Sequence, residues 1–190
     1  MGPFETKRLH LRRFRLADLD DIYTQVYADP AVCAMYCGET LSRAQVHNRL
    51  LYRAHQPDSA EFGYLAIVLR ATTGASARVI GQINLTPFAN SYYRLPGEPA
   101  TPCNALEVEL AFALGAAYWG QGLAFEACQP VIRYAFEALK VPRLMSGIVM
   151  TNERSIDLHK RLGYRIERNQ CEDDICGLVA VLDNPLIRNA

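Results

Sequence analysis

The chain has 190 residues, 50% hydrophobic and 21% charged, which is typical of one globular domain and excludes a disordered or fibrous chain. Its 20 Lys and Arg residues balance its 20 Asp and Glu residues, and this zero net charge argues against a nucleic-acid binder that relies on a basic surface. No apolar run approaches about 18 residues, so we expect neither a membrane span nor a secretory leader.

The periodicity of apolar residues predicts about seven strands and four helices. In chain order they are a strand at 6–14, helices at 16–27 and 42–56, strands at 63–69, 78–85 and 107–114, a helix at 122–139, a strand at 144–150, a helix at 155–162, and strands at 164–168 and 175–182. Asp29-Pro30 should end the first helix, and Ser42 should cap the second. This order predicts one α/β (α+β) domain over residues 1–190, with a mixed, mostly antiparallel sheet and helices on both faces.

Two connections stand out between the predicted strands. Residues 72–76 read as a hairpin turn. Residues 87–104 contain four prolines, so we expect a long loop without regular structure. Loops of this length often carry function, and Tyr92 and Tyr93 within it could grip a ligand that carries an amine. The alternative is a variable surface loop.

The cysteines indicate a reducing environment. They are Cys33, Cys37, Cys103, Cys128, Cys171 and Cys176. None has a His or Cys partner at the spacing of a zinc site, and a disulfide framework is not expected in a chain of this size without a leader. We therefore expect reduced thiols, no bound metal and a cytoplasmic location.

The segment EVELAFALGAAYWGQGLA, residues 107–124, runs from a strand through a turn with Gly120 and Gly122 into a helix. Glycines let a backbone approach a ligand closely, and the first turn of a helix presents unpaired N–H groups at the positive end of its dipole. This arrangement suits a pyrophosphate. There is no Walker lysine and no third glycine of a dinucleotide fingerprint. The alternative is a plain turn.

A second segment, MTNERSIDLHKRLGY at residues 150–164, places Asn152, Ser155 and His159 on one face of a helix. Polar side chains that share a face can act on the same ligand. The alternatives are a simple N-cap for Asn152, a solvent-facing serine for Ser155, and a surface histidine beside Lys160 and Arg161 for His159.

These two segments resemble the GNAT acetyltransferase superfamily. AYWGQGLAFEA is similar to its acyl-CoA pyrophosphate motif, usually Gln/Arg-x-x-Gly-x-Gly/Ala, with Trp119, Gly122 and Ala124 at the matched positions. Trp119 departs from Gln or Arg, and this departure is shared by the branch that resembles ribosomal-protein N-terminal acetyltransferases. The opening TKRLHLRRF and the N-x-x-S…LGY stretch resemble that branch as well, and the resemblance runs from about residue 4 to residue 182.

The resemblance implies that the chain binds acetyl-CoA without a metal and that the fourth and fifth strands splay around the pantetheine arm. Main-chain groups that would pair with pantetheine belong to Phe112, Ala113 and Leu114. Backbone N–H groups that would hold the pyrophosphate belong to Trp119, Gly120, Gln121, Gly122, Leu123 and Ala124. Asn152 would contact the pantetheine side. The superfamily often has a Tyr that protonates the leaving thiolate at the position of His159, so this histidine is a departure.

The chemistry implied is direct attack of a neutral primary amine on the thioester, without a covalent enzyme intermediate. Neutralising an α-amino group at pH 7 costs about 1 kcal/mol, against about 4–5 kcal/mol for a lysine. Glu109 is the candidate base, and Glu107 shares its strand face. Ser155 and His159 are candidates for the proton donor or an orienting group. The alternative for each glutamate is a solvated carboxylate, and Cys128 is expected in the core.

The predicted function is therefore an N-acetyltransferase whose acceptor is a protein N-terminus or a small-molecule amine. Residues 87–104 would border the acceptor site. A non-catalytic sensor that binds acyl-CoA is the alternative, and a plain interaction module is a third class. The sequence leaves open whether the protein is a monomer or a homodimer, and it predicts neither a nucleic-acid nor a membrane partner.

Overall fold

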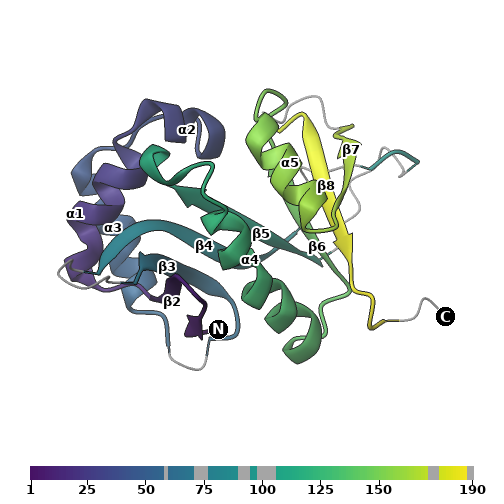
Figure 1. The fold of residues 1–190 in the computed structure, drawn as a ribbon, viewed down its shortest axis with the longest axis horizontal. Coiled ribbons are helices and arrows are strands. Elements are labelled where there is room, and N and C mark those ends of the chain that lie inside the picture. Colours follow the sequence, from purple (N-terminus) through teal and green to yellow (C-terminus); the bar gives the residue numbers. More distant parts are fainter. Residues whose placement is uncertain (58–59, 71–76, 90–94, 98–105, 171–175, 188–190) are drawn as a thin grey trace. The chain divides into compact units, whose positions relative to one another are not determined.

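A computed structural model describes residues 1–57, 60–70, 77–89, 95–97, 106–170 and 176–187 (Figure 1). Its strands are β1 (Phe4–Glu5), β2 (Leu9–Arg13), β3 (Gly63–Leu69), β4 (Arg78–Ala89), β5 (Leu106–Leu114), β6 (Arg143–Ile148), β7 (Arg165–Arg168) and β8 (Leu178–Asp183). Its α-helices are α1 (Leu19–Ile22), α2 (Pro30–Tyr36), α3 (Arg43–Ala54), α4 (Leu123–Arg133) and α5 (Glu153–Arg161). Short 3₁₀ segments η1 (Leu16–Asp18) and η3 (Ala116–Tyr118), and π segments η2 (Tyr23–Tyr27) and η4 (Tyr134–Ala138), extend or join them.

The strands form one eight-stranded sheet in the order β1-β2-β3-β4-β5-β6-β8-β7. The pairs β1/β2, β2/β3, β6/β8 and β7/β8 are antiparallel, whereas β5 and β6 are parallel. The predicted mixed, mostly antiparallel sheet is confirmed. The eighth strand is β1, a two-residue strand whose Phe4 lies opposite Leu11.

Two features differ from the sequence prediction. Asp29-Pro30 ends the first helical segment, but the same dipeptide also begins α2, because the Asp29 side chain accepts a hydrogen bond from the Ala31 N–H at 2.9 Å and Pro30 suits the first helical position. The prediction that residues 87–104 lack regular structure is wrong for residues 87–89, since β4 continues to Ala89. The rest of that loop with Tyr92 and Tyr93, apart from residues 95–97, lies outside the described residues, as does the turn at 72–76.

Other local predictions are confirmed. Ser42 caps α3 in a capping box with Gln45. Among the described residues, Cys33, Cys37, Cys128 and Cys176 form no disulfide, while Cys103 and Cys171 lie outside the described residues. Burial raises the pKa of the Cys33 thiol to about 12 and also raises the pKa of Cys128. These two thiols therefore stay protonated at neutral pH.

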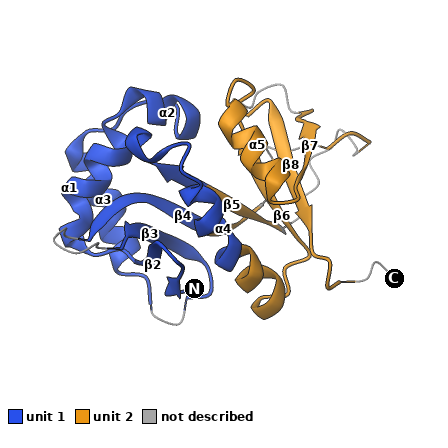
Figure 2. Ribbon diagram, viewed as in Figure 1, with its two compact units in different colours: residues 1–84, 112–131 blue, residues 85–111, 132–190 orange. Residues whose placement is uncertain are grey.

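The chain divides into two compact units (Figure 2). Unit 1 comprises residues 1–84 and 112–131, and unit 2 comprises residues 85–111 and 132–190. The boundaries cut through β4, β5 and α4, so each unit contains a part of these elements.

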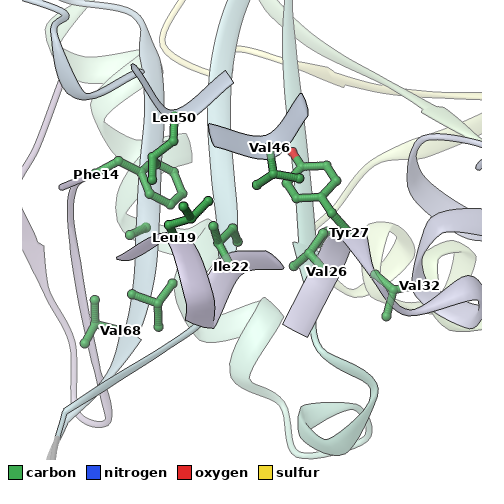
Figure 3. Close-up of a cluster of buried hydrophobic side chains, with 12 residues drawn as sticks. Phe14, Leu19, Ile22, Val26, Tyr27, Val32, Val46, Leu50 and Val68 are labelled. Atoms are coloured by element: carbon green, nitrogen blue, oxygen red, sulfur yellow. The ribbon is translucent and has the colours of Figure 1, made fainter. Parts of the chain in front are cut away.

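The core of unit 1 lies between its helices and one face of the sheet (Figure 3). Ile22 and Leu50 from α1 and α3 pack with Ala66 and Val68 of β3. Leu9 and Leu11 of β2 lie opposite Leu69 and Ile67 of β3, which alternate with Val68 and Ala66 and therefore face the other side of the sheet. Helix α4 covers this second side, so unit 1 has helices on both faces, as predicted.

Unit 2 has its own apolar core. Met145 of β6 packs with Val179 and Val181 of β8 and with Leu95. The β6/β8 register places Met145 opposite Val181. Helix α5 packs on β7. This unit therefore fixes the position of α5 relative to β6–β8.

Candidate functional site

The glycine turn of unit 1 has the backbone that the sequence predicts. Gly120 and Gly122 have φ values of 71° and 73°, in the left-handed region where a side chain is strained. A Cβ placed at Gly120 would meet nothing within 4 Å, so open space adjoins the turn. Helix α4 begins at Leu123, directly after it. The turn and the first N–H groups of α4 therefore form a backbone surface that an anion can approach.

The residues before the turn are anchored by hydrogen bonds. The Trp119 indole Nε1 donates to the Leu114 carbonyl at 2.8 Å, and the Trp119 backbone N–H donates to Ala116 at 3.2 Å. The side chain of Gln121 donates to the Ala117 carbonyl at 2.9 Å. The Trp119 N–H thus already has a protein acceptor, which leaves residues 120–124 as the stronger part of the predicted pyrophosphate site.

Arg8 and Glu126 hold the glycine turn in place, and neither residue is among those predicted from the sequence. Arg8 Nε lies 2.6 Å from Glu126 Oε2, and Arg8 Nη1 donates to the Gln121 carbonyl at 2.9 Å. Thr6 Oγ1 and the Arg8 backbone N–H each donate to Glu126 Oε1 at 2.7 Å. Burial tends to raise the pKa of Glu126, but these hydrogen bonds and the Arg8 charge lower it below its ordinary value. Glu126 is therefore ionised at neutral pH.

The predicted pantetheine-binding residues lie on β5 just before the turn. A Cβ at Gly81 of β4 would lie 2.1 Å from the Ala113 carbonyl oxygen, so the β4 backbone occupies that side of β5. The Leu114 carbonyl accepts from the Trp119 indole. The carbonyls of Ala113 and Leu114 therefore already face protein atoms. Phe112 is the half-buried residue among the three whose main-chain groups are predicted to pair with pantetheine.

The two glutamates of β5 lie in unit 2 and have different environments. Glu107 is buried and pairs with Arg143, whose Nε lies 3.0 Å from both carboxylate oxygens. Glu107 and Arg143 line an open pocket of about 490 Å³ with Asp183 and Asn184. Glu109 is half-buried and lies opposite Met145 of β6 in the parallel register. The Glu107 carboxylate is engaged by Arg143, and Glu109 stays the sequence-predicted candidate for a base.

Helix α5 brings together Asn152, Ser155 and His159, as the spacing predicts. The Asn152 side chain accepts from the Ser155 N–H at 3.1 Å and so caps the helix. Ser155 Oγ lies 3.2 Å from His159 Nδ1, which also lies 2.8 Å from the Ser155 carbonyl. The alternative that Asn152 is an N-cap is therefore confirmed, while its role toward a cofactor stays a prediction.

His159 is buried rather than on the surface. Only 2% of it is exposed, and its ring meets Tyr164 edge to face with centroids 5.0 Å apart. Burial lowers the pKa of His159, partly opposed by the hydrogen bond to Ser155. The ring is thus neutral at pH 7, and its Nδ1 proton points to the Ser155 carbonyl, so this geometry favours Ser155 over His159 as the group that acts on a ligand.

The described parts of the chain hold neither a cluster of metal ligands nor a helix able to span a membrane. Within residues 1–57, 60–70, 77–89, 95–97, 106–170 and 176–187, no group of three or more His, Cys, Asp or Glu side chains could hold a metal ion. None of the helices in these ranges combines the length and apolar character needed to cross a membrane.

Comparison with known proteins decides the family. The sequence profile of the acetyltransferase (GNAT) domain matches residues 8–165. The chain belongs to the GNAT acetyltransferase family. The matched region of this GNAT protein includes the glycine turn and the whole of α5.

Individual relatives agree with this assignment. The GNAT chain is 25% identical over 168 residues to the uncharacterized N-acetyltransferase p20 of Bacillus licheniformis, covering 88% of this chain and 84% of that protein. It is 38% identical over 58 residues, 30% of each chain, to the [ribosomal protein uS5]-alanine N-acetyltransferase of Escherichia coli. An acetyltransferase structure from Agrobacterium tumefaciens matches with a TM-score of 0.70 at 24% identity, covering 96% of this chain and 94% of that one. This last likeness concerns the fold.

Proposed function

We propose that this GNAT protein transfers the acetyl group of acetyl-CoA to a primary amine by direct attack. The observation that carries the proposal is the turn with Gly120 and Gly122, both at positive φ, that leads into the N-terminus of α4. Such a backbone surface suits the diphosphate of CoA. Family membership supports the acetyl group as cargo.

The donor would be held mainly by backbone groups. N–H groups of residues 120–124 would bind the diphosphate, and main-chain groups near Phe112 would pair with the pantetheine amides. Asn152 would contact the pantetheine side in addition to capping α5. No metal takes part in this scheme, because the helix N-terminus supplies the positive potential for the phosphates.

The reaction needs a neutral amine and a protonated leaving group. The amine nitrogen attacks the thioester carbonyl, an N–C bond forms, the C–S bond breaks, and the amine loses a proton. Glu109, directly or through a water, would accept that proton. The thiolate leaves as CoA after it gains a proton, with the Ser155 hydroxyl as the candidate donor or orienting group.

The acceptor class is a protein N-terminus or a small-molecule amine. An α-amino group suits a modest base, because its pKa of about 7.7–8.0 leaves a usable neutral fraction at pH 7. The relative from Escherichia coli is named for an alanine of ribosomal protein uS5. Peptides with N-terminal Ala or Ser are therefore the first acceptors to test.

Incubation with acetyl-CoA and a panel of amines tests the proposal. The panel should contain peptides with free and blocked N-termini, lysine derivatives and small amines, with free CoA thiol and acetylated product both measured. We expect release of CoA matched by acetylation of one amine class. CoA binding without turnover on any amine would favour a non-catalytic sensor, and absence of CoA binding would contradict the proposal.

A further inference from the structure

Arg8 connects the N-terminal segment of unit 1 to the glycine turn and to helix α4, whose contacting residues lie 113 and 118 positions away in the sequence. Its guanidinium contacts Glu126 in α4 through Nε and the Gln121 carbonyl in the glycine turn through Nη1. Its backbone N–H also donates to Glu126. Arg8 itself precedes β2, whose Leu9 and Leu11 are fully buried, so this clamp is fixed to a rigid strand.

The contact with Gln121 fixes the orientation of one peptide group. In a trans peptide the carbonyl oxygen of one residue and the N–H of the next point in opposite directions. Because the Gln121 carbonyl points to Arg8, the Gly122 N–H points away from Arg8. Gly122 is one of the residues whose N–H groups the proposed function assigns to the diphosphate.

The turn could otherwise adopt another arrangement. Glycine populates positive and negative φ about equally, so the peptide between Gln121 and Gly122 can rotate at small cost when nothing holds its carbonyl. A rotated peptide would present a carbonyl oxygen to the anion in place of an N–H group. The two-pronged geometry of arginine, with Nε on Glu126 and Nη1 on Gln121, selects one orientation.

Glu126 both holds the Arg8 side chain and creates a need for its positive charge. Its carboxylate lies in the first turn of α4, next to the surface proposed for an anion. The hydrogen bonds from Thr6 and Arg8 keep it ionised and directed toward the N-terminal segment. The charge of Arg8 offsets the charge of Glu126, which would otherwise repel a phosphate.

We infer that Arg8 is a positioning residue for diphosphate binding: it holds the Gln121 carbonyl so that the Gly122 N–H faces the CoA diphosphate. This inference rests on the proposed function. Arg8 would act on CoA indirectly, by orienting the peptide between Gln121 and Gly122, and its own side chain need not contact the ligand.

The test compares Arg8→Met, Arg8→Lys and Arg43→Met with the wild-type protein. Arg43 is the matched control, because it forms an exposed ion pair with Asp20 in the same unit. Titration calorimetry with CoA gives Kd, thermal unfolding gives Tm, and ³¹P NMR of bound CoA reports its diphosphate and its 3′-phosphate separately. Arg8→Lys keeps the charge but lacks the planar fork that reaches both partners.

We expect Arg8→Met to raise the Kd for CoA about tenfold. Its bound diphosphate resonances should shift toward those of free CoA, while the 3′-phosphate resonance stays in place. Arg8→Lys should have the Tm of wild type, but its diphosphate resonances should return less than half of the way to their wild-type positions. Arg43→Met should match wild type in Kd, Tm and resonances.

Unchanged diphosphate resonances in Arg8→Met, with or without a change in Kd, would overturn the inference, as would full recovery by lysine. A wild-type protein that fails to bind CoA would instead overturn the proposed function. The wild-type titration therefore separates the two failures.

Discussion

The N-termini of α4 and α5 in this GNAT protein differ in whether a side chain caps them. At α5, the Asn152 side chain accepts from the Ser155 N–H at 3.1 Å, so the protein satisfies its own helix end. At α4, the preceding residue is Gly122, which has no side chain with which to cap, and its φ of 73° turns the backbone sharply into the helix. The comparison shows that the residue before a helix decides whether a side chain caps its N–H groups, and at α4 the proposed function assigns these groups to the diphosphate.

The surroundings reinforce the difference. The turn before α4 is held from outside by Arg8 and from within by the Gln121 and Trp119 hydrogen bonds. A loop fixed in this way loses little conformational freedom when an anion binds, which favours affinity. At α5, the polar residues Ser155 and His159 instead bond to one another.

The largest expected effect on CoA affinity comes from replacing the glycine that precedes α4. Gly122→Val should weaken CoA binding at least about 100-fold, because a β-branched residue is strained at a φ of 73° and would change the backbone of the turn that the diphosphate approaches. Titration calorimetry with CoA measures the effect. Gly38→Val is the matched control, since Gly38 has a φ of 88° and a Cβ there would meet nothing within 4 Å. Equal losses of CoA affinity in both variants would show that the turn has no special part in binding.

A second substitution separates CoA binding at the N-terminus of α4 from the proton transfer proposed for Glu109 of β5. Glu109→Gln should lower kcat about 30-fold at pH 6.5 and only a few-fold near pH 9, because the acceptor amine loses its proton unaided as pH rises. The Kd for CoA should stay the same. Glu107→Gln, which breaks the buried pair with Arg143, should lower Tm without changing the pH dependence of kcat. A pH–rate profile of Glu109→Gln parallel to wild type would remove Glu109 from the mechanism.

Removal of the α5 cap should have a smaller effect. Asn152→Ala should lower the free energy of unfolding by about 1 kcal/mol, because the Ser155 N–H loses its acceptor. Denaturant titration measures this change, and Asn152→Asp should restore it. If Asn152 also contacts the cofactor, Asp should not restore CoA affinity.

Ser42→Ala is the matched control for the cap. It removes the capping box of α3 at a similar cost in stability and should leave CoA binding unchanged. An Asn152→Ala variant as stable as wild type would contradict the contrast between the two helix ends.

The smallest expected effect concerns His159. Burial lowers its pKa in the folded state, so between the ordinary value near about 6.5 and the lower folded value the unfolded chain binds more protons. The free energy of unfolding should therefore fall as pH drops from 7.5 to 5.5, with His159 contributing to that fall.

His159→Gln should show a correspondingly weaker loss between these two pH values in urea titrations. Identical pH dependence in wild type and His159→Gln would contradict the burial argument.

Much of the fold could be predicted from the sequence, because apolar periodicity gave the order of elements and, for β3, its exact bounds. Helix α2 could not, since Asp29-Pro30 signals an end and a beginning equally well. The glycine turn was predicted because glycine reports backbone geometry locally. Arg8 and Glu126 were missed because they are 118 residues apart, and no local pattern reports such a pair. The engagement of Glu107 likewise depends on Arg143, 36 residues further along the chain.

The measurement that tests the central claim most directly is titration calorimetry of the wild-type protein with CoA and with pantetheine, which lacks the diphosphate. If the glycine turn and the N-terminus of α4 bind the diphosphate, CoA should bind with a Kd below about 1 mM, and pantetheine should bind at least about 100-fold more weakly. Failure of CoA to bind at millimolar concentration, or equal affinity for the two ligands, would contradict the account.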